Sequence, residues 1–158
     1  MSGPRIVFSR FLSANSPKLS PWVAHMDQVI VGMPVVAHPD GADGVTVWHL
    51  VSANNRHLAR SVELHGSFAE AEASARGVIA SRADLVVEPV SQASRGSYGW
   101  YALRDDVPVM VCARWYLTPR DQRQSIALAL RSLDEAELHA GVRLVHQTNN
   151  GERQPLLA

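Results

Sequence analysis

Residues 45–70 read VTVWHLVSANNRHLARSVELHGSFAE, and this stretch decides the fold. Its first seven residues, 45–51, are rich in β-branched and aromatic side chains, which is typical of a strand. Asn54-Asn55 follows, and asparagine tolerates the positive φ that a two-residue hairpin turn requires. Residues 57–64 return as a second strand, so the stretch predicts a β-hairpin.

The hairpin is followed by a signal for the start of a helix. Ser67 and Glu70 form a capping box, in which the serine oxygen accepts from the amide of Glu70 and the glutamate reaches back to the amide of Ser67. Apolar residues recur behind the box at helical spacing, so we expect the helix to run to about Ala83. A short apolar run at residues 85–87 ends at Pro89. The inward face of the helix is predicted to hold Phe68, Ala71, Ala75, Val78 and Ile79.

The same order of signals returns after a Ser/Gly-rich link at residues 91–99. Thr118-Pro119 marks the start of a second helix, because proline at the first helical position lacks only an amide that has no helical partner. Glycine is common just beyond a helix end, which makes Gly141 the expected stop. The predicted elements are a strand at 100–103, a turn at Asp105-Asp106, a strand at 107–117, a helix from Thr118 to Gly141 and a strand at 142–145.

Two markers of different kinds repeat at nearly the same interval. Trp48 and Trp100 are 52 residues apart, and the helix caps Ser67 and Thr118 are 51 apart. We infer an internal repeat and an α+β fold, in which two tandem strand-strand-helix repeats form an antiparallel sheet covered by two helices. The predicted divisions are an irregular N-terminal arm at 1–44, a first repeat at 45–90, a second, divergent repeat at 98–146 and a C-terminal tail at 147–158.

The first repeat resembles the YegP-like repeat found in small, mostly bacterial proteins of unknown function. The likeness covers residues 45–83 well and residues 98–133 weakly, and Asn55 stands where that family usually has glycine. The resemblance implies paired strand-strand-helix units that dimerise through sheet edges, and it brings no catalytic residues. It is carried by Trp48-His49-Leu50, Ala53-Asn54, Leu58-Ala59, Ser61 and Ser67, then by a helix with Ala71 and Ile79.

Composition excludes several classes of protein. The chain has 158 residues, of which 46% are hydrophobic and 19% charged, and this suits one globular domain rather than a disordered chain. Fifteen basic residues balance fifteen acidic ones, which argues against a coat for duplex nucleic acid or an anionic membrane. No apolar stretch approaches the ~20 residues of a membrane-spanning helix. The single cysteine, Cys112, excludes an intramolecular disulfide, and we expect a cytoplasmic protein.

The sequence offers no constellation for catalysis. Among the seven histidines no pair has the i, i+4 spacing with a glutamate that zinc hydrolases use. With Asn54-Asn55 as the turn, His49 faces Arg60. The same register places His57 opposite Ser52, so the histidines do not converge with carboxylates. Nucleophile elbows and glycine-rich phosphate loops are also missing. We therefore expect no catalytic residues, no metal, no cofactor and no enzymatic activity.

One segment, residues 95–131, has an unusual make-up of six arginines and three aspartates interleaved with tyrosine and tryptophan. Arginine with aromatic residues is typical of protein-interface hot spots and of surfaces that stack single-stranded nucleic acid. The alternative is that Trp100 packs inward and the arginines form a solvated face. The candidate binding residues are Arg95, Arg104, Arg114, Trp115, Tyr116, Arg120 and Arg123.

These features predict a non-enzymatic cytoplasmic interaction module that self-associates or binds another protein. The alternative is an RNA-binding, single-strand-binding or ribosome-associated protein, and a membrane is not expected. Free sheet edges invite pairing with a second chain. The apolar segments of the arm, around Trp22 and 29–31, should either cap a sheet edge in their own chain or cross to a second copy. The predicted core is Leu50, Ala59, Phe68, Ile79, Trp100, Ile126 and Leu130.

Overall fold

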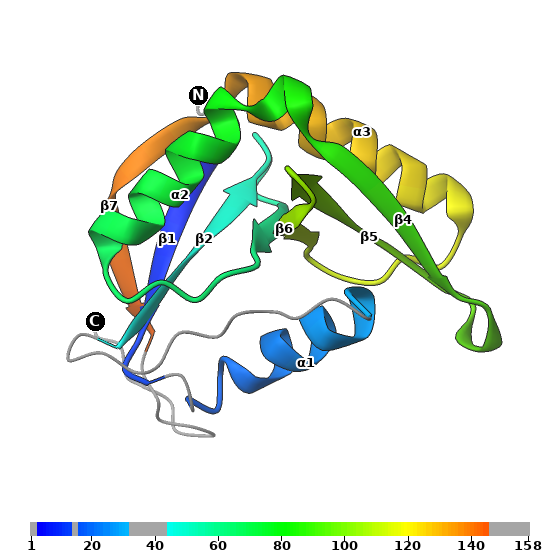
Figure 1. Ribbon diagram of the computed structural model, residues 1–158, viewed down its shortest axis with the longest axis horizontal. Helices are drawn as coiled ribbons and strands as arrows, with labels where there is room; N and C mark the ends of the chain where they lie inside the picture. The colour runs from blue at the N-terminus through cyan, green and yellow to red at the C-terminus, as the bar shows by residue number, and fades with distance from the viewer. Residues whose placement is uncertain (1–2, 14–15, 32–43, 146–158) are drawn as a thin grey trace.

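The structure is a computed structural model that describes residues 3–13, 16–31 and 44–145. Within these residues three α-helices pack on one seven-stranded sheet of order β4-β5-β6-β3-β2-β1-β7, so the fold class is α+β as predicted (Figure 1). Neighbouring strands are antiparallel except β1 and β7, which run parallel. The strands are β1 (Arg5–Phe11), β2 (Val45–Val51), β3 (His57–Ser61), β4 (Val86–Gln92), β5 (Ser97–Arg104), β6 (Val107–Cys112) and β7 (Glu137–Val145). The helices are α1 (Ser20–Val29), α2 (Phe68–Ala80) and α3 (Pro119–Glu135), with 3-10 turns η1 (Arg82–Asp84) and η2 (Ala93–Arg95).

The hairpin of β2 and β3 pairs His49 with Arg60, as the sequence predicts. The register shifts further along, so His57 lies opposite Val51 and the predicted pairing with Ser52 is wrong. The reason is a longer turn, in which the carbonyl of Arg56 accepts from the amide of Ser52 at 2.9 Å, instead of a two-residue turn at Asn54-Asn55.

The second hairpin joins β5 to β6 through the predicted Asp105-Asp106 turn. Both residues have positive φ, 52° and 66°, as a type I′ turn requires. Strand β6 ends at Cys112 rather than at Leu117. Beyond it the chain makes a single bridge between Tyr98 and Tyr116 before it enters α3.

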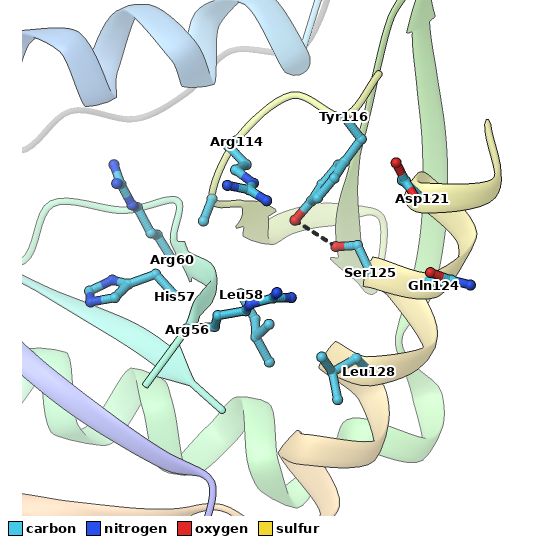
Figure 2. Close-up of a pocket in the computed structure, with 11 residues that line it drawn as sticks. Arg56, His57, Leu58, Arg60, Arg114, Tyr116, Asp121, Gln124, Ser125 and Leu128 are labelled. Carbon is cyan, nitrogen blue, oxygen red and sulfur yellow. Dashed lines mark hydrogen bonds between the residues drawn. The ribbon is translucent and has the colours of Figure 1, made fainter. Parts of the chain in front are cut away.

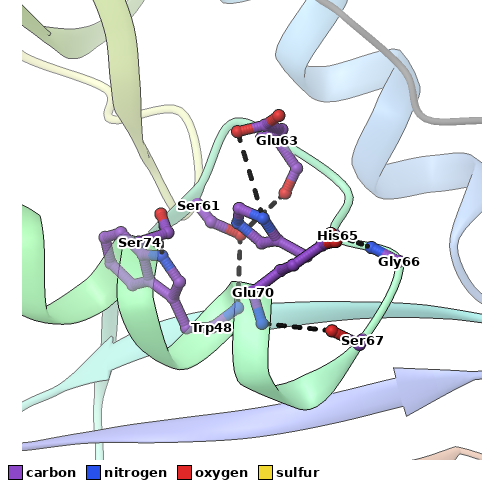
Figure 3. Close-up of polar contacts among 8 residues, drawn as sticks. All are labelled: Trp48, Ser61, Glu63, His65, Gly66, Ser67, Glu70 and Ser74. Atoms are coloured by element: carbon purple, nitrogen blue, oxygen red, sulfur yellow. Dashed lines mark hydrogen bonds and ion pairs between the residues drawn. The ribbon is translucent and has the colours of Figure 1, made fainter.

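Both central helices begin where the sequence predicts. The Ser67 side chain accepts from the amide of Glu70 at 3.1 Å, and that of Thr118 accepts from the amide of Asp121 at 3.0 Å. The reciprocal half of the capping box differs, because Glu70 accepts from the amide of Gly66 instead of Ser67 (Figure 3).

The predicted irregular arm at 1–44 is wrong for its described residues. Strand β1 lies inside the sheet between β2 and β7, and Ile6 and Phe8 are fully buried. Helix α1 buries Trp22 and Met26. The segment around Trp22 belongs to α1, which packs on a face of the sheet (Figure 1), so the expectation that it caps a sheet edge is wrong. Ile6 and Phe8, two residues apart and both buried, carried the strand signal of β1.

The last six residues of the predicted second helix, 136–141, are also wrong. Helix α3 ends at Glu135, and Ala136 already has extended backbone angles, φ −69° and ψ 140°. Residues 137–145 form β7, which pairs with β1 along nearly its whole length. The partner strand, β1, was not predicted from the sequence. Its pairing with residues 137–145 ends the helix before the stop that Gly141 had indicated. The predicted tail at 147–158 lies outside the described residues.

The sheet separates two layers of helix, with α2 and α3 on one face and α1 on the other (Figure 1). Strand β2 is buried on both faces for this reason. The predicted core residues Leu50, Ala59 and Trp100 are each 0% exposed. Phe68, Ile79 and Ile126 are half-buried against this core, and Leu130 is half-buried outside it.

The two halves share contacts at the interval seen in the sequence. The indole Nε1 of Trp48 donates to Ser74 Oγ at 3.1 Å, and that of Trp100 donates to Ser125 Oγ at 3.0 Å. Ser61 Oγ accepts from the amide of Trp48, while the Cys112 sulfur accepts from the amide of Trp100. Strand order extends the correspondence to β1 and β4, so each half has three strands and a helix.

Candidate functional site

A hollow of about 540 Å³ lies where the start of β3 faces α3 (Figure 2). We call it the Arg114 cleft. It joins the two halves, because β3 belongs to the first and α3 to the second. Its lining residues are Arg56, His57, Leu58, Arg60, Ala113, Arg114, Tyr116, Asp121, Gln124, Ser125 and Leu128.

Two arginines reach into this cleft from opposite loops (Figure 2). Arg56 leaves the β2–β3 turn, where its amide donates to Ser52 Oγ at 3.1 Å. Arg114 follows β6, and its guanidinium lies 5.5 Å from the ring centre of Tyr116. Within the described residues neither guanidinium forms an ion pair. Both charges are therefore available to a ligand.

Arg60 lies at the border between the cleft and α1. Its guanidinium is 5.7 Å from the ring centre of Trp22, and Figure 2 shows it turned toward α1. Burial lowers the pKa of Arg60, and its Nε has no hydrogen-bond partner among the described residues. A partly buried cation without a carboxylate partner favours an anion nearby.

The opposite wall is polar and held in place by hydrogen bonds. Ser125 accepts from the indole of Trp100 and donates to the Tyr116 hydroxyl oxygen at 2.9 Å. Because that oxygen accepts from Ser125, the Tyr116 hydroxyl proton is left to point at a ligand. Asp121 is the one carboxylate that lines the cleft in the described chain.

The same position in the other half holds a cleft of about 570 Å³ between α2 and the start of β6. We call it the Glu63 cleft. Residues 51 positions apart in the sequence occupy equivalent places in the two clefts. Glu63 therefore stands where the Arg114 cleft has Arg114, and Val107 stands where it has Arg56. The wall is lined by Glu63, His65, Glu70, Ala73, Ser74, Arg104, Val107, Pro108 and Val109 (several are drawn in Figure 3).

The structure separates the candidate residues chosen from the sequence. Arg114 and Tyr116 line the Arg114 cleft, whereas Arg104 lines the Glu63 cleft. Trp115 faces α1, where its indole donates to Gln28 at 3.3 Å. The remaining three are elsewhere: Arg95 ends η2, and Arg120 and Arg123 are exposed at the start of α3. The seven residues therefore do not share one face, and their binding role stays a prediction.

Sequence reasoning missed Arg56, His57 and Arg60 as site residues. They stand in and after the first hairpin turn, 54 or more residues before Arg114. Leu58-Ala59 separates Arg56-His57 from Arg60 without alternation, so the sequence gave no signal of a basic site here. Trp100 packs inward, as the alternative account of the arginine segment supposed.

The groups usually used in catalysis are poorly placed here. Burial raises the pKa of the Cys112 thiol to about 11, so it stays protonated at neutral pH. Burial, and then the charges of Arg60, His57 and Arg143, lowers the pKa of His49 to about 3. No three His, Cys, Asp or Glu side chains of the described residues gather as a metal site would require.

Comparison with known proteins returns two solved structures, both of proteins whose function is unknown or unstated. YegP from E. coli shares 17% identity over 76% of this chain and 99% of its own, with a TM-score of 0.45. The chain resembles YegP. A UPF0339 protein from Shewanella oneidensis shares 11% identity over 68% of this chain and 87% of its own, with a TM-score of 0.48. The YegP-like resemblance seen in the sequence thus returns in the structure comparison, and these likenesses carry no information about function.

No protein-family model and no curated protein matches the sequence. Among the described helices, none combines the length and the hydropathy needed to cross a bilayer.

Proposed function

We propose that this chain is a non-enzymatic binding module that takes an anionic group in the Arg114 cleft. The observation that carries the proposal is the pair of guanidiniums of Arg56 and Arg114, which point into one hollow without an ion-pair partner among the described residues. Arginine presents five donors in a planar fork that matches phosphate and carboxylate oxygens.

Phosphate fits this cleft better than a single carboxylate. Two forks and the Tyr116 hydroxyl offer more donors than two carboxylate oxygens accept, whereas a phosphate has three terminal oxygens. The buried thiol of Cys112 and the low pKa of His49 support a binding role over a catalytic one. A cytoplasmic location belongs to the proposal, since Cys112 is a free thiol and requires no oxidising compartment.

The test is an NMR titration of the full chain with inorganic pyrophosphate. The proposal expects saturable shifts at the amides of residues 56–60 and 113–125, which surround the Arg114 cleft. Amides at 63–74 and 104–109, around the Glu63 cleft, serve as the internal control and should move little. Shifts confined to the control amides, or no saturable shifts at all, would refute the assignment.

Self-association is a second candidate, supported by β7. This strand ends the sheet, so its outer edge has no strand beside it in the described chain. Val142 and Leu144 on β7 are 40% and 42% exposed. An unpaired edge with exposed apolar residues favours pairing with a second strand. The opposite edge is less suited, because Pro89 in β4 lacks a donor.

Sedimentation velocity over a range of protein concentrations tests this second candidate. A dimer that is weakened by Leu144→Lys would support edge pairing through β7. A monomer at every concentration, or a dimer that is indifferent to this substitution, would eliminate it.

A further inference from the structure

A second basic hollow adjoins the Arg114 cleft on the face of the sheet that carries α1. It measures about 450 Å³ and lies over β1 and β7. His57 lines both hollows, so the two lie next to each other. We call the second one the Arg143 hollow; its lining residues are Arg5, Val7, Phe8, Ser9, His57, His139, Gly141, Val142 and Arg143.

The permanently charged residues that line the Arg143 hollow are both arginines, Arg5 and Arg143. No described carboxylate lines it, and Arg143 forms no ion pair in the described chain. The pKa of His57 is lowered first by burial and then by Arg60, Arg143 and Arg5. Each of these charges is positive, so arginines of both hollows oppose a positive charge on His57. An anion that lies across them relieves this repulsion.

The two hollows together are too long for one phosphate group. Their lining residues come from β3 at one end and from β1 and β7 at the other, and β2 lies between β3 and β1 in the sheet. Neighbouring strands are about 4.8 Å apart, so three steps cover roughly 14 Å. A ligand that contacts Arg114 at one end and Arg143 at the other must carry several anionic groups in a row.

We propose that the Arg114 cleft and the Arg143 hollow form one track for a single-stranded nucleic acid. The proposal rests on the proposed function, since the Arg114 cleft supplies the first phosphate site. Planar groups favour a nucleic acid over an acidic peptide. The exposed ring of His57 and the exposed guanidinium of Arg114, which lies over the Tyr116 ring, are flat groups on which bases stack, and an acidic peptide would make no use of them.

The experiment measures fluorescence anisotropy of a labelled ten-residue oligothymidylate with the full chain, at several salt concentrations. Single strands release counterions with a slope of about −0.7 per phosphate, so three or four contacts give a slope of about −2 to −3 in log K against log salt. Arg143→Gln should weaken oligonucleotide binding and make the slope about 0.7 shallower. The same variant should bind pyrophosphate like the wild type, because Arg143 lies outside the Arg114 cleft.

The matched control is Arg131→Gln, which removes an exposed arginine of α3 that lines neither hollow. It should leave both the affinity and the slope unchanged. The track is refuted, while the Arg114 cleft stands, if pyrophosphate binds but the oligonucleotide binds no more tightly than pyrophosphate. The same conclusion follows if Arg143→Gln leaves oligonucleotide binding unchanged. If neither ligand binds, both proposals fail. Equal competition by an oligoglutamate peptide would show a general polyanion site and overturn the nucleic-acid assignment.

Discussion

The Arg114 cleft and the Glu63 cleft occupy the same place in the two halves of the molecule, yet their chemistry is opposite. Each lies between a capped helix of one half and the returning strand of the other. One brings Arg56 and Arg114 together with a single carboxylate, Asp121. The other carries Glu63 and Glu70 with one arginine. The backbone provides two clefts, and only the Arg114 cleft presents the pair of arginines to which we propose that an anion binds.

The structural contacts of the halves are much more alike than their clefts. Both tryptophan indoles donate to a helix serine, and both helix caps accept from the amide three residues on. These residues fix the strand-to-helix geometry and leave little freedom for change. The cleft positions contact solvent and tolerate either charge, so a difference between the halves at these positions points to function rather than folding.

Replacing each tryptophan with alanine is the most severe test of this equivalence. Trp48 and Trp100 are both 0% exposed, so either substitution should cost about 3–5 kcal/mol in the free energy of unfolding. Urea denaturation of Trp48→Ala and Trp100→Ala measures these free energies of unfolding. If the alanine variants do not fold, Trp48→Phe and Trp100→Phe give the same comparison with a milder change. A cost below about 1 kcal/mol in one half alone would break the equivalence.

Acid should destabilise the chain through a group of the first half that the second half lacks. The first half has His49 where the second half has Tyr101. The pKa of His49 is lowered to about 3 in the folded chain. The unfolded chain therefore takes up the proton first, and stability is full above pH 6.5 and falls as the pH drops toward 3. Between pH 7 and pH 5 this one group should remove about 2 kcal/mol.

Urea midpoints at both pH values for His49→Gln measure that contribution. The variant should lose less stability on acidification than the wild type. His139→Gln, which alters an exposed histidine, is the control and should behave like the wild type. An unchanged acid response in His49→Gln would place the sensitivity elsewhere.

A smaller difference is expected at the serines that accept from the indoles. Ser125 is buried and also donates to Tyr116, so Ser125→Ala leaves a buried indole unpaired and should cost about 2 kcal/mol. Ser74 is half-buried, so water can replace its oxygen and Ser74→Ala should cost less than about 1 kcal/mol. Thermal melts of the two variants compare them directly, and equal costs would contradict this reading of their surroundings.

The local signals in the sequence were sufficient to locate both hairpins and both helix starts, but they did not give the turn length of the first hairpin. Ser67 and Thr118 start the helices by accepting hydrogen bonds from amides three residues further on. Asp105 and Asp106 form the turn by adopting positive φ angles themselves. Such features depend on neighbours along the chain. They could therefore be predicted before the fold was known.

The parts that could not be predicted depend on distant partners. The sequence predicted only the end of β7, residues 142–145, because the rest of this strand depends on pairing with β1, some 130 residues earlier in the sequence. The Arg114 cleft has the same origin, since Arg56 and Arg114 are far apart in sequence and meet only through the pairing of β3 with β6. Composition drew attention to Arg114 and Tyr116 but gave no sign of Arg56.

The central claim is that the side chains of the Arg114 cleft, on a shared scaffold, confer anion binding. Isothermal titration with pyrophosphate tests it on three proteins: the wild type, Arg56→Gln/Arg114→Gln, and Glu63→Arg/Val107→Arg, which places the same two arginines in the Glu63 cleft. Near-ultraviolet circular dichroism first verifies that each is folded. We predict one site in the wild type, an affinity at least tenfold lower in the first variant and a second site in the other. Wild-type binding by Arg56→Gln/Arg114→Gln would contradict the account.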